Sequence, residues 1–110
     1  MHHLKLTDLP FAGMSHRFTG NEQGDVAVSA YLAHAPESRG SVLHTHPYDT
    51  IAFVLSGTGR WTVDGESQDV SPGDIVVVRA GSAHQFVNTG KGNLEIIDIH
   101  VNPTIEQTNV

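Results

Sequence analysis

The 110-residue chain contains no cysteine, which excludes disulfide bonds, iron–sulfur clusters and zinc sites built from thiolates. No apolar run approaches the roughly 18 residues of a membrane-spanning helix, and the first residues lack the apolar core of a secretion signal. With six basic residues against twelve acidic ones, the chain also lacks the basic surface of a nucleic-acid-binding protein. These absences predict a soluble, cytoplasmic protein that binds neither nucleic acid nor membranes.

Helical patterns are missing as well, because no stretch of ten residues or more keeps an apolar period of about 3.6 residues. Short β-branched runs alternate instead with turns rich in glycine, proline and aspartate. One turn, Asp64-Gly65, has the composition of a two-residue type I′ hairpin. The pattern predicts an all-β fold, an antiparallel sandwich or barrel of short strands. The expected strands are 26–34, 41–46, 50–56, 60–63, 74–79, 84–88 and 94–101.

Residues 1–25 are less regular than the rest of the chain. We interpret them as an N-terminal arm, with one strand near His3–Leu6 that could swap to a second copy, and we interpret residues 26–110 as one β-barrel domain. The expected strand 50–56 is apolar on both faces, so both faces need cover, from a second sheet or from a partner subunit. We therefore expect a homodimer.

The strongest chemical signal is the tripeptide His44-Thr45-His46. Side chains two residues apart on a strand share a face, so both imidazoles can reach one point. His84, at the start of a later strand, can join them from a neighbouring strand. Imidazole suits divalent transition metals, and three of these ligands leave coordination positions open. His44, His46 and His84 are thus a candidate metal site, for which iron, zinc, nickel, manganese and copper are all suitable.

These histidines lie in two motifs that resemble those of the cupin superfamily. The first runs from Gly40 to Gly57 around the paired histidines, and the second runs from Gly73 through His84 to Asn88. The resemblance implies a cupin-type double-stranded β-helix, or jelly-roll barrel, with a metal in its lumen and often a dimeric assembly. Three-histidine sites occur in this family among thiol and diketone dioxygenases.

Two positions depart from the family's pattern. Thr50 stands where the family usually carries a glutamate ligand, and the adjacent Asp49 faces the opposite side of the strand unless a bulge re-aims it. Without that carboxylate a divalent ion keeps its full charge, which favours an anionic or chelating ligand. Arg79 replaces the proline of the second motif. It either holds a substrate carboxylate at the barrel mouth or carries a solvated surface charge.

Strand alternation also predicts the walls of a substrate pocket beside the metal. Thr50 and Ala52 should face the same side as the histidines, and Phe86 should share the face of His84. Tyr48 and Trp61 are expected at the entrance of this pocket. A few polar groups in an apolar pocket are typical of small-molecule sites.

Three further residues are candidates for catalysis. Asp98 and His100 share a face of the last long strand, where they could form an acid–base pair or where His100 could supply a fourth metal ligand. Arg79 is the third candidate. Apart from these candidates, the alternation of side chains along a strand predicts that Val42 points inward, on the same side as His44 and His46.

These observations favour a metal-dependent enzyme that acts on a small organic anion or a carbonyl compound. Iron would support dioxygenase chemistry, whereas a Lewis-acid metal would support isomerase, lyase or cyclase chemistry. A non-catalytic small-molecule sensor is the alternative, favoured by Thr50 and by the scarcity of acid–base groups. A metal-free barrel kept for protein–protein contact is a third reading.

Overall fold

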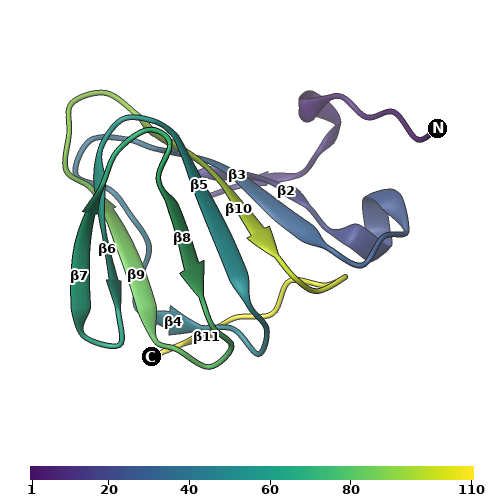
Figure 1. The fold of residues 1–110 in the computed structure, drawn as a ribbon. Helices are drawn as coiled ribbons and strands as arrows, with labels where there is room; N and C mark the ends of the chain where they lie inside the picture. Colours follow the sequence, from purple (N-terminus) through teal and green to yellow (C-terminus); the bar gives the residue numbers. More distant parts are fainter.

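The computed structural model describes all 110 residues, and it consists of two antiparallel sheets that face each other (Figure 1). The six-stranded sheet has the order β1-β2-β3-β10-β5-β8, and the five-stranded sheet has the order β11-β4-β9-β6-β7. This is the jelly-roll architecture predicted from the sequence. The strands are β1 (Phe11–Ala12), β2 (Ser15–Phe18), β3 (Ser29–Ala35), β4 (His44–Thr45), β5 (Thr50–Ser56), β6 (Gly59–Val63), β7 (Glu66–Val70), β8 (Ile75–Val78), β9 (His84–Asn88), β10 (Leu94–His100) and β11 (Thr108–Asn109).

Helical structure is limited to a 3₁₀ turn, η1 (Leu6–Asp8), and one π-helical turn, η2 (Gly20–Gly24). Neither segment has the length or the apolar character needed to cross a membrane. The strand expected near His3–Leu6 is wrong, since no strand forms there. Instead the backbone N–H of Lys5 donates to the carboxylate of Asp8 over 3.0 Å, and this bond closes the turn.

The N-terminal region contributes strands further along the chain than expected. β1 and β2 form a hairpin, and β2 pairs with β3 of the same chain. β2 reads Ser-His-Arg-Phe, with a single large apolar residue, so it carries no alternation that a sequence pattern could detect. Two other expected strands are shorter than predicted: the one at 26–34 begins only at Ser29, and the one at 41–46 is reduced to His44–Thr45.

The Asp64-Gly65 turn is confirmed as a type I′ hairpin. Both residues have positive φ angles, 49° and 84°, as this turn requires. The hairpin joins β6 to β7, with Val63 opposite Glu66. β7 was not among the expected strands because four of its five residues are exposed and polar, as befits an edge strand.

The core lies between the two sheets, where alternate residues of β5 and β10 point inward. Ala52, Val54, Leu94 and Ile96 are all nearly or fully buried there. Gly40 is required where the incoming chain crosses β9, because a Cβ atom at this position would overlap the carbonyl oxygen of Phe86. Close packing on this inner face holds the sheets at the spacing on which the site depends.

Substituting Leu94 by alanine should destabilise the fold substantially. Leu94 is completely buried, and removing a buried leucine side chain costs about 2–5 kcal/mol through lost burial and the cavity left behind. Urea unfolding would measure the change. Leu6→Ala is the matched control, since Leu6 is 42% exposed and should change stability by less than about 0.5 kcal/mol. Equal effects of the two substitutions would contradict this account of the core.

Candidate metal centre and its cavity

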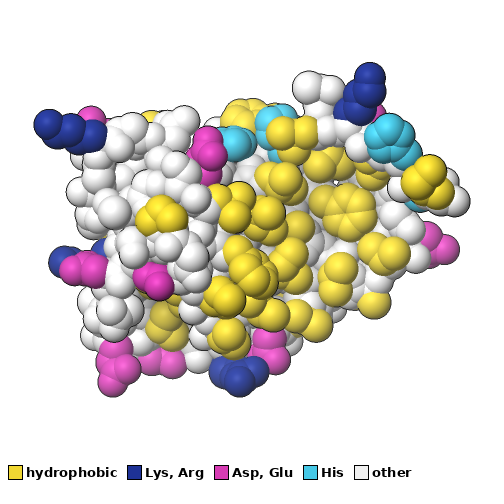
Figure 2. Space-filling view, turned by 45° about the horizontal axis from the view of Figure 1, so that its top comes forward, with side chains coloured by type: hydrophobic (Ala, Val, Ile, Leu, Met, Phe, Trp, Pro, Cys, Tyr) yellow, Lys and Arg dark blue, Asp and Glu magenta, His cyan; other side chains and the backbone are white.

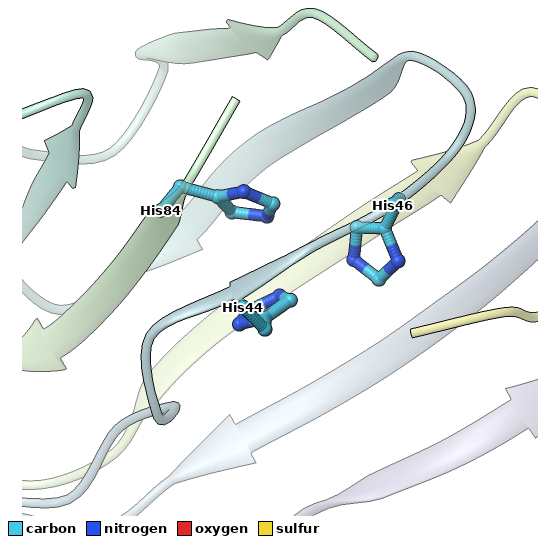
Figure 3. Close-up of side chains that lie close together, drawn as sticks. All are labelled: His44, His46 and His84. Atoms are coloured by element: carbon cyan, nitrogen blue, oxygen red, sulfur yellow. The ribbon is translucent and has the colours of Figure 1, made fainter. Parts of the chain in front are cut away.

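Two neighbouring strands of the five-stranded sheet bring three histidines together. His44 lies on β4, directly opposite His84 at the start of β9, and His46 follows β4 by one residue. All three are buried, with 6%, 5% and 3% of their surface exposed, respectively. One ring nitrogen from each lies within 4.8 Å of those of the other two. Figure 3 shows the three rings converging on a common space between β4 and β9.

Backbone carbonyls orient each of these rings through its Nδ1 atom. His44 Nδ1 lies 2.6 Å from the oxygen of Val42, His46 Nδ1 lies 2.6 Å from the oxygen of Glu106, and His84 Nδ1 lies 2.9 Å from the oxygen of Ser82. A carbonyl can only accept, so each Nδ1 carries the proton and each Nε2 keeps a free lone pair. Metal-bound histidines are held by the same kind of outer hydrogen bond.

One buried atom of the cluster has no partner within the protein. His46 Nε2 is buried and makes no hydrogen bond, although buried polar atoms are normally satisfied. A cation accepting this lone pair would satisfy it. The donor set therefore fits a divalent transition metal, for which neutral imidazole is a suitable ligand.

Burial keeps the imidazoles of His44 and His46 in the neutral form that can act as a ligand. Desolvation lowers the pKa of His44, and it lowers the pKa of His46 to about 4, with repulsion from the neighbouring histidines acting in the same direction. The hydrogen bonds that His44 and His46 donate to the carbonyls of Val42 and Glu106 oppose these shifts and are outweighed. At neutral pH both rings are therefore uncharged.

Neither Thr50, at the position of the family's usual glutamate ligand, nor the adjacent Asp49 contributes a carboxylate to the cluster. Thr50 is buried on the inner face of β5. Asp49 points away from the cluster, where its Oδ1 accepts the N–H of Ala80 over 2.9 Å and its Oδ2 lies 3.7 Å from the guanidinium of Arg79. Asp49 is thus outside the group of residues whose donor atoms converge, as strand alternation predicts. Arg79 has 77% of its side chain exposed, so of its two predicted roles the surface charge is the one observed.

A buried hydrogen-bonded network lies behind His46. The Tyr48 hydroxyl is 2.7 Å from Nδ1 of His100, and it also contacts the backbone nitrogen and oxygen of Glu106 at 3.0 and 3.1 Å. His100 is completely buried, and its Nε2 lies 3.3 Å from Oδ2 of Asp98. The placement of Tyr48 at a pocket entrance is wrong. Its ring stacks on His46 and anchors the C-terminal segment beneath it.

A cavity of about 210 Å³ opens beside the cluster, between the two sheets. His44 and His84 form part of its wall, and Trp61 stacks on Phe86 with ring centroids 4.8 Å apart. The expected inward position of Val42 is wrong, because the strand begins only at His44 and Val42 is 58% exposed. Of the pocket and catalytic residues expected from the sequence, the wall includes Thr50, Ala52, Trp61, Phe86 and Asp98.

Sequence reasoning missed the wall contributed by the N-terminal region. Met14, Ser15 and Arg17 from the β1–β2 hairpin and Tyr31 from β3 line the same cavity. These residues carry no motif, and only the pairing of β2 with β3 brings them to the inner face. No sequence signal singled out Glu106 either, since it acts through its backbone.

Comparison with known proteins identifies the family. The model of the family described as "Cupin domain" matches residues 30–100, which is more than half of the chain. The chain belongs to the cupin family. This cupin resembles solved structures of oxalate decarboxylase from Bacillus subtilis. One of them has a TM-score of 0.86 at 18% identity, over 97% of this chain and 31% of that one. A second, described by its Mn(II) centres, has a TM-score of 0.80 at 18% identity, over 93% and 29%.

Two other relatives match a smaller share of this cupin. A cupin superfamily protein from Desulfitobacterium hafniense has a TM-score of 0.63 at 24% identity, over 69% of this chain and 68% of that one. A 45-residue segment is 33% identical to the transcriptional activator RhaS of Mannheimia succiniciproducens, over 41% of this chain and 17% of that protein. The chain spans less than a third of both the decarboxylase and the activator, and the structural likenesses establish the fold.

Replacing Tyr48 by phenylalanine should loosen the segment beneath His46. The change removes the hydroxyl that contacts His100 and Glu106, and leaving buried polar partners unsatisfied costs about 1–3 kcal/mol. We expect lower stability in urea and faster hydrogen exchange at the Glu106 amide. Tyr31→Phe is the control, because the Tyr31 hydroxyl makes no hydrogen bond within the chain. Unchanged exchange at Glu106 in the Tyr48 variant would show that the network does not hold this segment.

Proposed function

We propose that His44, His46 and His84 bind a divalent transition metal and that this cupin is a metal-dependent enzyme acting on a small organic anion or carbonyl compound. The observation that carries the proposal is the cluster itself: three buried imidazoles, each fixed through Nδ1, with ring nitrogens within 4.8 Å of one another. Holding three such rings together without a cation would leave the buried Nε2 of His46 unsatisfied.

The metal, when bound, would supply either Lewis-acid polarisation of a substrate oxygen or, if it is redox-active, chemistry with oxygen. The chain's own residues provide the rest of the site. Trp61 and Phe86 form an apolar wall that excludes water from the bound molecule. Asp98 presents a carboxylate to the cavity and is backed by His100, so it is placed to take up or release a proton.

Manganese is the first metal to test, with iron, zinc, nickel and copper beside it. The B. subtilis decarboxylase described above contains Mn(II) centres. Three neutral imidazoles do not discriminate strongly among these ions, whose selection depends on geometry and supply. With no carboxylate in the cluster the ion keeps both positive charges, which favours an anionic substrate.

A non-catalytic sensor is the second candidate function. Thr50 in place of a carboxylate ligand favours this alternative, and so does the segment that is similar to a transcriptional activator. A sensor would bind its small molecule in the same cavity without converting it. The enzyme would convert the bound molecule and would need the metal to do so. The sensor would leave the molecule unchanged and would bind it with or without the metal.

Removing any of the three histidines should abolish stoichiometric metal binding. We expect His44→Ala and His84→Ala to retain less than about a tenth of the metal held by the wild type, because two imidazoles chelate far less strongly than three. Elemental analysis of protein purified without a histidine tag would measure this. His34→Ala is the matched control, since His34 lies on β3 outside the cluster and should leave the metal content unchanged. Metal-free wild type, even after metal is added, would contradict the proposal.

The enzyme and the sensor are separated by assaying each metal form on a panel of hydroxy acids, diketones and thiols. The enzyme predicts product formation or oxygen consumption that is lost in His84→Ala and after chelation. The sensor predicts ligand binding that survives chelation, with no product from any metal form.

We also propose that a second copy of this chain covers the outer face of the six-stranded sheet. Hydrophobic side chains gather over the middle of this face in Figure 2, and the register places them side by side across four strands. Interface centres are depleted in charge, and homodimer interfaces are more apolar than the rest of a protein surface. The apolar face consists of Leu32, Ile51, Phe53, Ile75, Val77, Ile97 and Ile99, of which Ile75 and Val77 are the most exposed, at 58% and 48%.

A charge placed in this face should separate the two copies. We expect the wild type to sediment with the mass of two chains at micromolar concentration and Phe53→Lys to sediment as one. Gln68→Lys, on the exposed edge strand β7 of the other sheet, should remain a dimer. A wild-type mass equal to one chain would refute the dimer. Within one chain β2 pairs with β3. The swapping of an N-terminal strand between two copies remains a prediction.

A further inference from the structure

One wall of the cavity carries an unpaired positive charge. Arg17 is the only lysine or arginine among the residues that line the cavity, although the chain contains six basic residues. Its side chain makes no hydrogen bond or ion pair, whereas the guanidinium groups of Arg60 and Arg79 each lie near a carboxylate. The guanidinium carbon of Arg17 lies 5.2 Å from the centre of the Tyr31 ring, within range of a cation–π interaction.

Strand register places three polar side chains in one row, with Arg17 at the exposed edge of the cavity and Tyr31 and Asp98 partly buried. Arg17 of β2 is opposite Tyr31 of β3, and Tyr31 is opposite Asp98 of β10. All three line the cavity that His44 and His84 also line. Burial raises the pKa of the Tyr31 phenol; Arg17 opposes this shift and Asp98 adds to it, so both charged groups act on the phenol. The row therefore presents a cation, a phenol and a carboxylate side by side.

Each member of the row has bonding capacity left for a ligand. The guanidinium offers its donors to a carboxylate, which it can bind through two parallel hydrogen bonds. The Tyr31 hydroxyl makes no hydrogen bond within the chain. Asp98 uses Oδ2 towards His100 and leaves Oδ1 free to accept from a hydroxyl group. A second carboxylate near Asp98 would be repelled.

We propose that Arg17, Tyr31 and Asp98 form a subsite for a small hydroxy acid with a single carboxylate, which Arg17 binds while Asp98 accepts the hydroxyl. The inference rests on the proposed function in that the subsite lines the same cavity as His44 and His84. The cavity of about 210 Å³ has room for a small molecule of this kind. Arg17 takes the role that the sequence had offered to Arg79.

L-Lactate is a suitable probe, with lactamide as its uncharged counterpart. Calorimetry on zinc-loaded protein should show Arg17→Gln binding lactate about tenfold more weakly than the wild type, a change equivalent to roughly 1.4 kcal/mol. Arg17→Lys should lie between them, because lysine keeps the charge but not the bidentate geometry. Lactamide should bind weakly, with equal affinity for the wild type and Arg17→Gln. Arg39→Gln is the matched control, as Arg39 is an exposed arginine outside the cavity wall, and it should bind lactate like the wild type.

The role of Asp98 is tested with the dicarboxylate malonate. The wild type should prefer lactate to malonate, and Asp98→Asn should reduce or reverse that preference by removing the repelling charge. Equal affinities of the wild type and Asp98→Asn for malonate would overturn the part assigned to Asp98.

Metal content is measured in every variant, which separates the two proposals. Metal-free wild type would defeat the proposed metal site, and the lactate comparison would then be made on the protein as purified, with the same dependence on Arg17 expected. Equal lactate affinities of wild type and Arg17→Gln, or no lactate binding by the wild type, would overturn the subsite.

Discussion

The pairing of β4 with β9 is the constraint on which the site depends. It sets His44 directly opposite His84, and the short strand then delivers His46 two residues later on the same side. Each ring is turned by a backbone carbonyl, which costs the protein no additional side chain. The orientation of the three rings is thus specified by backbone carbonyls and not by other side chains.

The C-terminal segment is part of this specification. Glu106 donates its N–H to Tyr48 and accepts from His46 through its carbonyl, so a stretch after the last long strand fixes the ring that directly follows β4. Strand β11 then pairs with β4 and closes the edge of the five-stranded sheet. A carbonyl supplied by a distant segment makes the orientation of His46 dependent on the complete fold, and local structure around β4 alone would not provide it.

The sequence predicts this protein best where side chains alternate between the two faces of a strand. Thr50, Ala52 and Phe86 lie on the cavity wall because β5 and β9 are long enough for alternation to apply, and the Asp64-Gly65 turn forms because its conformation demands these residues. Tyr48 and Val42 were misplaced because they flank β4, a strand of only two residues, where alternation does not extend. The β1–β2 hairpin was missed because its few residues bear no periodic apolar pattern.

The charges around the cavity are best understood from the absence of a carboxylate in the histidine cluster. A carboxylate ligand would cancel one charge of the metal and would weaken the field that draws an anion inward. With Thr50 in that position, the negative group of the site lies instead on β10, at Asp98, and the positive one lies on β2, at Arg17. A ligand entering between the sheets then meets charges of opposite sign on one wall and neutral imidazoles on another. Such an arrangement selects the orientation of a bound anion as well as its charge, because only one end of the molecule is attracted to each group.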